Sequence, residues 1–137
     1  MTFPPRFWLA LGFIAGMLLG TIAHAGTLAG TVRYVVDGDS AVVGMVGQRA
    51  VRVRISDIDA PERHGRCIAE IEMAERARDR LKVLIGGRRV LLVIHDRDHD
   101  RYGRLLAEVW VDGQPVGPQL VKEGLARPWT GRRMPWC

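Results

Sequence analysis

Acidic and basic side chains gather in three short segments that lie far apart along this sequence: residues 37–40 (DGDS), 54–62 (RISDIDAPE) and 100–104 (DRYGR). Carboxylate oxygens are the ligands that hard divalent cations prefer, and the planar guanidinium group of arginine fits the oxygens of a phosphate. Hydrolysis of a phosphodiester needs a cation, an oriented water molecule and positive charge near the transition state. If folding brings the three segments together, the chain has groups for all of these tasks.

Each segment taken alone has a simpler explanation. An Asp-Gly-Asp sequence between two strands is usually only a turn. Pro61 can end a strand and leave Glu62 in solvent, and the third segment can be a charged hairpin turn. The acids within residues 95–101 (HDRDHDR) are interpreted as a solvated loop, with the alternative that Asp100 tunes Arg104. Only the combination of the three segments points to chemistry.

Three strands are predicted in the first half of the chain. Residues 28–36 alternate with a period of two, and a turn at the Asp-Gly-Asp sequence leads into a second strand at residues 40–46. In the third strand, residues 51–56, valine and isoleucine share one face while arginine and serine share the other. Short turns between them indicate an antiparallel meander, with the first two charged segments at strand ends.

The second half of the chain changes pattern. Residues 68–85 carry a helical apolar stripe, residues 90–94 and 104–111 are predicted strands, and a short helix is expected at 118–123. The fold class predicted from this order is α+β, mainly β: a five-stranded OB-fold barrel with two or three flanking helices.

The three charged segments, followed by residues 120–126 (LVKEGLA), resemble the thermonuclease (staphylococcal nuclease-like) family in order and spacing. The resemblance covers the chain from the first strand to Arg127. It implies an OB-type barrel and a calcium-dependent endonuclease that cleaves DNA and RNA and leaves 3′-phosphate ends.

The resemblance also implies a cation site. Asp39 and Asp59 would be the side-chain ligands of Ca²⁺, and Ala60 would contribute its backbone carbonyl. Glu62 would orient or deprotonate the attacking water. Ser40 and Ala60 stand where the best-known member has threonine; Ser40 keeps the hydroxyl, whereas the change at Ala60 leaves the calcium affinity open.

Four further residues match phosphate-binding positions of the family. Arg54 and Arg104 would bind the scissile phosphate and stabilise the five-coordinate transition state. Arg101 and Tyr102 match positions that hold a neighbouring phosphate.

Two other classes of protein compete with an enzyme. OB barrels also bind single-stranded nucleic acid without cleaving it, and a third possibility is a structural or protein-binding barrel whose charges are incidental. A barrel that had lost catalysis should lack some of the three acids and two arginines, and none is missing. Trp129 or Trp136 could stack a base, although packing of the tail or anchoring through Cys137 is the simpler explanation.

The first 25 residues have the plan of a secretory signal peptide: one basic residue, Arg6, then an apolar run and an Ala-His-Ala site. An uncleaved membrane anchor is the alternative. We therefore expect a signal peptide at residues 1–25, a nuclease domain at 26–137, and a periplasmic or secreted monomer without stable membrane association. The chain has a net charge of +5, which suits DNA or RNA as partner.

The two cysteines, Cys67 and Cys137, are expected to pair, because export would place them in an oxidising compartment. Such a bridge closes a loop of about 70 residues, which the chain-entropy model values at about 4 kcal/mol. A catalytic thiol is the less favoured alternative.

The remaining titratable groups are predicted to be solvated. On the long helix, Glu70, Glu72 and Glu75 are assigned to the solvent face. No two histidines fit a zinc motif, so ordinary surface positions are expected for His64, His95 and His99.

Overall fold

The computed structural model describes residues 26–95 and 97–137. Residues 1–25, where the sequence predicts a signal peptide, lie outside this part of the chain. Within it, no helix has the length and apolar character needed to cross a membrane.

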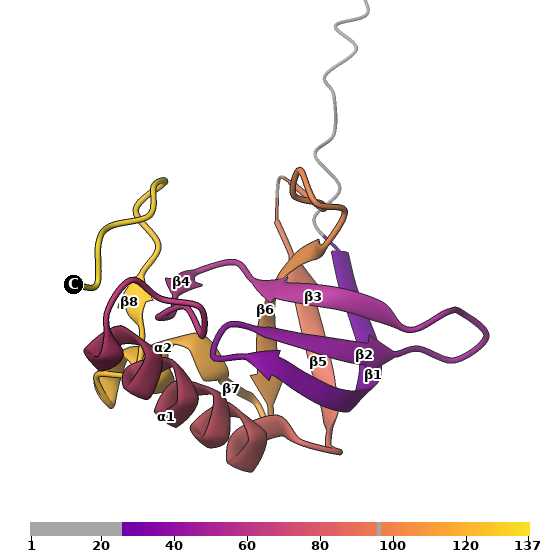
Figure 1. Ribbon diagram of the computed structural model, residues 1–137. Coiled ribbons are helices and arrows are strands. Elements are labelled where there is room, and N and C mark those ends of the chain that lie inside the picture. Colours follow the sequence, from indigo (N-terminus) through magenta and orange to yellow (C-terminus); the bar gives the residue numbers. More distant parts are fainter. Residues whose placement is uncertain (1–25, 96) are drawn as a thin grey trace, which may run out of the picture.

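Five strands form a closed barrel (Figure 1). Their order is β3-β2-β1-β5-β6, and a further pairing between β6 and β3 closes the ring. The β3–β6 pair is parallel, whereas the other pairs are antiparallel. The five strands are β1 (Gly26–Asp37), β2 (Ser40–Gly44), β3 (Val51–Ile55), β5 (Arg89–Ile94) and β6 (Leu105–Val111). This is the OB-type barrel that the sequence predicts.

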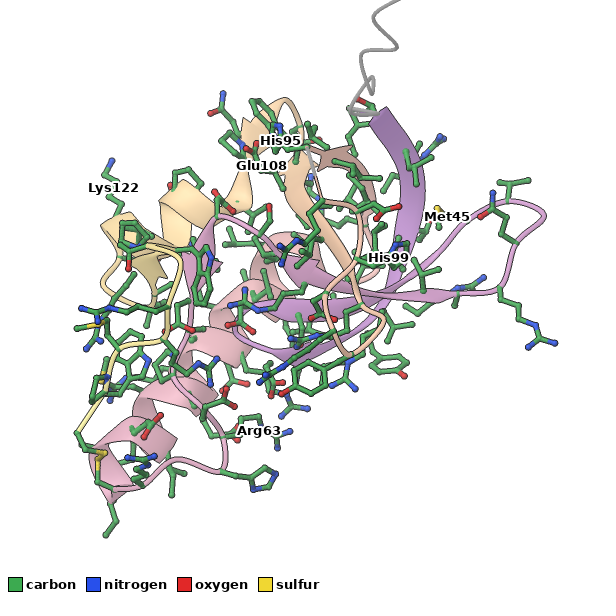
Figure 2. All side chains as sticks on the ribbon, turned by 90° about the horizontal axis from the view of Figure 1, so that it is seen from above. Met45, Arg63, His95, His99, Glu108 and Lys122 are labelled. Atoms are coloured by element: carbon green, nitrogen blue, oxygen red, sulfur yellow. A yellow bond between two sulfur atoms is a disulfide. The ribbon has the colours of Figure 1, made fainter. Side chains whose placement is uncertain are left out.

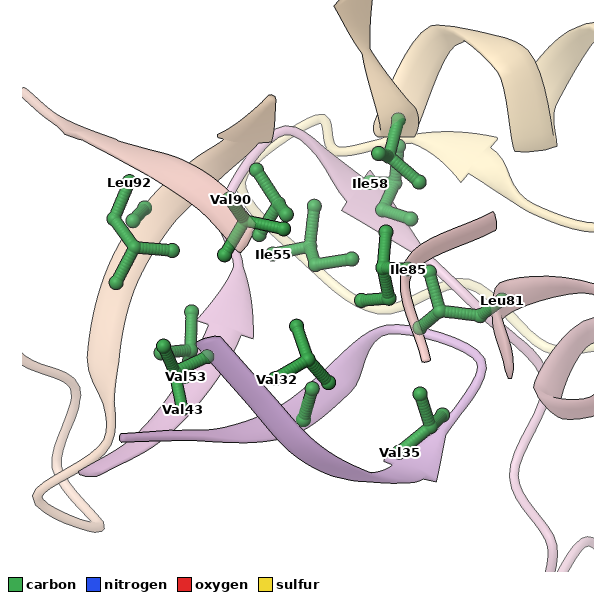
Figure 3. Packing of buried hydrophobic residues seen from close by; sticks show 14 of the residues in the cluster. Val32, Val35, Val43, Val53, Ile55, Ile58, Leu81, Ile85, Val90 and Leu92 are labelled. Carbon is green, nitrogen blue, oxygen red and sulfur yellow. The ribbon is translucent and has the colours of Figure 1, made fainter. Parts of the chain in front are cut away.

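The barrel is filled by branched aliphatic side chains, which point inward at every second position of the strands (Figure 3). Val53 and Ile55 of β3 are completely buried, and Leu92 of β5 faces them from the same core. Leu81 and Ile85 of helix α1 (Ile68–Ile85) join this cluster. The helix thus completes the core and lies beside the turn between β1 and β2 (Figure 1).

Strand β1 is long enough to pair with two neighbours. Residues 26–31 pair with β5 and residues 31–37 with β2, and the register to β2 shifts twice, before Tyr34 and before Asp37. Such irregularities bend and twist a strand. The bend carries the end of β1 toward α1 and with it the first charged segment.

The rest of the chain forms short elements: β4 (Ile58–Asp59), β7 (Gln114–Pro115), α2 (Val116–Lys122) and β8 (Arg127–Pro128). The sequence did not predict β4, β7 or β8, and β8 pairs with β4. Helix α2 starts at Val116 rather than at residue 118, because a proline in the first turn of a helix removes no intrahelical hydrogen bond. Strand β2 ends at Gly44 rather than at residue 46, because a turn from Met45 to Gln48 follows it directly.

The assignment of Glu70 to the solvent face of the helix is wrong. Glu70 is buried, and its carboxylate accepts hydrogen bonds from the backbone N–H of Glu62 (3.2 Å) and of Arg66 (3.0 Å). The chain before α1 folds back over the first helical turn, and Gly65 packs directly against the Glu70 side chain. The carboxylate therefore holds the loop that carries Glu62.

Cys67 and Cys137 form the predicted disulfide. Cys67 is the residue directly before α1, so the bridge fixes the end of the chain beside the first turn of this helix.

Candidate active site

The first two charged segments meet where β1, β3 and β4 end. Ser40 pairs with Arg54 across β2 and β3, so Asp39 lies beside the end of β3. Nη2 of Arg54 is 3.4 Å from Oδ2 of Asp39 and 3.7 Å from Oδ1 of Asp59. All three side chains are buried. One guanidinium group thus lies between two carboxylates that are 20 positions apart in the sequence.

Arg54 is held in a fixed orientation. Its Nη1 atom donates to the backbone carbonyl of Ile58 at 2.8 Å and also to that of Ile55. The ring of Trp129, directly after β8, lies 5.8 Å from the centre of the guanidinium group. The C-terminal segment therefore covers one side of this arginine.

Burial changes the acidity of Asp39. Burial raises the pKa of its carboxyl above the ordinary value, although the charge of Arg54 and a hydrogen bond from the Ala60 N–H (2.9 Å) lower it. The ionised carboxylate is therefore only partly compensated, and a cation beside it would stabilise the charged form.

Gly38 allows the turn that carries Asp39 to pack tightly. A Cβ atom at this position would lie 2.6 Å from Cβ of Ala77 on α1 and 3.1 Å from Cβ of Ala60. The Asp-Gly-Asp sequence is thus more than a turn signal, because its glycine is the only residue that fits between the helix and the second segment.

Glu62 is linked to Asp59 by an arginine, Arg133, that the sequence did not mark. Nη2 of Arg133 lies 3.1 Å from Oδ1 of Asp59, and its Nη1 atom contacts Oε1 of Glu62. The Glu62 side chain is 45% exposed, so it is open to water. No motif marked Arg133; the only signal was the cysteine four residues later, which ties this tail to α1.

Arg104 lies on the same outer side of the barrel as Arg54. The parallel pairing of β3 and β6 matches Arg54 with Leu106, while Leu105 and Ala107 point into the core. Alternation along the strand puts Arg104, two residues before Leu106, on the side of Leu106 and hence of Arg54. The two arginines thus do not point to opposite sides of the barrel.

Asp100 holds Arg104 in place. Its Oδ2 atom accepts from Nε of Arg104 at 2.7 Å, and its Oδ1 atom accepts from the backbone N–H groups of Tyr102 and Arg104. Partial burial would raise the pKa of Asp100, but these hydrogen bonds outweigh it and lower the pKa below the ordinary value. The carboxylate is therefore a permanent partner of Arg104 at neutral pH.

Arg101 and Tyr102 are exposed at the tip of the same loop. Nη2 of Arg101 donates to the hydroxyl of Tyr102 at 2.7 Å, and the ring lies 4.8 Å from the guanidinium of Arg101 and 5.5 Å from that of Arg104. Together with Arg104, which lies at the side of the barrel, they form a second basic group that is open to solvent.

The donor set of the site suits a hard cation. Asp39, Asp59 and Glu62 offer only carboxylate oxygens, and backbone atoms of Ala60 lie beside Asp39. The acids are separated by guanidinium groups, Arg54 between the first two and Arg133 between the last two.

A tighter cluster of possible ligands lies elsewhere. Within the part of the chain that the structure describes, the one trio of His, Cys, Asp or Glu ligand atoms within 4.8 Å of one another is Cys67, Glu70 and Cys137. Both sulfurs of that trio are in the disulfide, so it cannot ligate a metal.

Two of the predicted surface histidines lie on the outside of the barrel, as expected. His95 contacts Glu108 at 2.8 Å, and Figure 2 shows the two side chains next to each other. His99 lies in the loop before Arg104, and its ring faces Asp98.

The fold and the site together define a class: an OB-type barrel whose outer side carries buried acids bridged by arginines. Residues 52–134 match the sequence profile of the family described as staphylococcal nuclease homologues. The chain therefore belongs to the staphylococcal nuclease family.

The chain is also similar to several named proteins. The chain is 42% identical over 114 residues to Protein ParB of Escherichia coli, 34% over 96 residues to a thermonuclease of Staphylococcus intermedius, and 36% over 99 residues to endonuclease YncB of Bacillus subtilis. These alignments cover 77%, 70% and 71% of this chain, and 58%, 56% and 46% of the respective relatives. The chain thus spans only about half the length of the relatives it matches.

Proposed function

We propose that this protein is a calcium-dependent endonuclease that hydrolyses phosphodiester bonds in DNA and RNA and leaves 3′-phosphate ends. The observation that carries the proposal is the buried Arg54, fixed between Asp39 and Asp59 on the side of the barrel where Arg104 also lies. The names of the relatives, thermonuclease and endonuclease, support the same reaction. The net charge of +5 favours a polyanionic substrate.

The acids are assigned to the cation and the water. Asp39 and Asp59 would hold Ca²⁺ with the carbonyl of Ala60, and the half-exposed carboxylate of Glu62 would orient the attacking water and accept its proton. When bound, the cation would polarise a phosphate oxygen and neutralise developing charge.

The arginines are assigned to the phosphate. Arg54 has its Nη1 atom committed to backbone carbonyls, which leaves Nη2 to exchange its carboxylate partners for a phosphate oxygen. Arg104 lies directly before β6 and would bind the same phosphate, while Arg101 and Tyr102 would hold the next phosphate along the nucleic acid.

We infer that the protein works outside the cytoplasm, in the periplasm or the medium, and as a monomer. The Cys67–Cys137 disulfide supports an oxidising compartment, and the apolar N-terminal segment supports export.

The test is a calcium titration of cleavage with the purified protein on single-stranded DNA, double-stranded DNA and RNA. We expect cleavage that EGTA abolishes and calcium restores, and products that a polymerase extends only after phosphatase treatment. An Asp59→Asn variant, which keeps the size of this buried side chain, should be inactive at every calcium concentration used, and its urea unfolding should confirm that it is folded. Salt-sensitive binding without cleavage under any divalent cation would instead establish a binding module, and cleavage in EGTA would refute the cation site.

Asp100 is predicted to act as a positioning residue for Arg104. Replacing it by asparagine weakens the ion pair at Nε, and a phosphate-binding group misplaced by about 1 Å can cost up to 10²-fold in rate. We expect Asp100→Asn to lower kcat about tenfold. Steady-state kinetics should show this loss in kcat. The thermal stability of the variant should stay close to that of the wild type.

Asp98→Asn is the matched control, because the Asp98 side chain is 73% exposed and its one ion pair within the described residues is with the ring of His99. Equal kinetics for the Asp98 and Asp100 variants would show that the loop acid does not position Arg104.

A further inference from the structure

Arg133 occupies the place between two of the acids that the proposed function assigns to the cation and the water. Its two terminal nitrogens contact different carboxylates, Oδ1 of Asp59 at 3.1 Å and Oε1 of Glu62. The Asp59 side chain is only 4% exposed, so a second positive charge at this oxygen and a bound cation would use the same space and the same negative charge.

The tail that carries Arg133 is anchored on both sides of it. Upstream, β8 pairs with β4, and the backbone N–H of Trp129 donates to the carbonyl of Asp57 at 2.9 Å. Downstream, Cys137 is bonded to Cys67. Arg127 ties the two sides together, because its Nη1 atom donates to the Pro135 carbonyl at 2.9 Å.

Anchoring at both ends turns the contact into an intramolecular one. A group on a short closed segment has a high effective concentration at the site it faces. The Arg133 side chain is still 44% exposed, so its release into water requires no unfolding of the tail. The ion pairs can therefore break while the tail stays in place.

We propose that Arg133 is an internal competitor of the divalent cation and sets the calcium affinity of the site. Calcium binding displaces the guanidinium from Asp59 and Glu62, and the disulfide keeps it close enough to return. The inference rests on the proposed cation site, and it concerns an arginine outside the four sequence segments that carry the resemblance.

Isothermal titration calorimetry with calcium alone tests the competition without any measurement of activity. We expect Arg133→Ala to bind calcium about fivefold more tightly than the wild type, because a competing ion pair to a poorly exposed carboxylate is lost. Arg132→Ala is the matched control, because it removes the same charge at the neighbouring position. Arg132 is exposed and has no carboxylate contact in the described structure. Its calcium affinity should stay within about twofold of the wild type, because general charge effects are screened by salt.

The outcomes separate this inference from the proposed function. Asp59→Asn, which keeps the size of the buried side chain, should lose calcium binding; if it does so while Arg133→Ala and Arg132→Ala bind calcium equally, the cation site stands and the competition is refuted. If the wild type binds no calcium, or Asp59→Asn binds it normally, both proposals are wrong.

Discussion

Replacing Arg104 by alanine is expected to lower kcat for cleavage of single-stranded DNA by a factor of about 10²–10³, the usual cost of removing one group that stabilises transition-state charge. The guanidinium lies on the outer side of the barrel and its partner Asp100 is in the same loop, so its loss leaves the core intact. The change should therefore be larger in kcat than in KM, because the proposed role of the arginine is to stabilise the additional charge that develops on the phosphate during the reaction.

Arg104 is a better test than Arg54. Arg54 is buried between two acids, and removing one partner of a buried ion pair typically costs about 3–5 kcal/mol of stability. A loss of activity in Arg54→Ala would mix misfolding with chemistry. Arg89→Ala serves as the control for Arg104→Ala, because it removes an equal charge from an exposed position at the start of β5. Equal rates for the two variants would contradict the role of Arg104.

Removing the disulfide is expected to lower the free energy of unfolding by about 4 kcal/mol, the chain-entropy value for a loop of this length. The bridge joins residues 70 positions apart, and it anchors the tail that covers Arg54. The measurement is urea unfolding of the Cys67→Ser, Cys137→Ser double variant beside the oxidised wild type, with the midpoint shifting to lower urea.

Reduction provides the internal control for this prediction. A reducing agent should bring the wild type to the stability of the double variant and leave the double variant unchanged. A difference below about 1 kcal/mol between oxidised and reduced wild type would show that tail packing alone, and not the cross-link, holds this end of the chain.

Much of the site was visible in the sequence because local residue types encode it. Asp39 and Asp59 could be placed at strand ends since alternation and turn residues mark where strands stop, and Arg104 could be placed at the start of a strand for the same reason. Helix α1 has the predicted bounds, because its apolar stripe and the two glycines after it are local signals.

The residues that sequence reasoning missed depend on contacts between distant segments. Glu70 has the spacing of a solvent-facing glutamate, and only the loop folded over the first turn of α1 makes it a buried acceptor of two N–H groups. Arg133 has no motif around it. Its contacts with Asp59 and Glu62 arise because β8 and the disulfide carry the tail back across the site.

By itself, the sequence determined the order of elements, the two cysteines that pair and the acids and arginines available for chemistry, because periodicity, turn residues and residue type are local properties. The tertiary structure decided which of these groups meet. The parallel pairing of β3 with β6 puts Arg54 and Arg104 on one side of the barrel, and the anchored tail brings Arg133 to Asp59. Both depend on strand register and chain closure over long sequence separations, which no local pattern specifies.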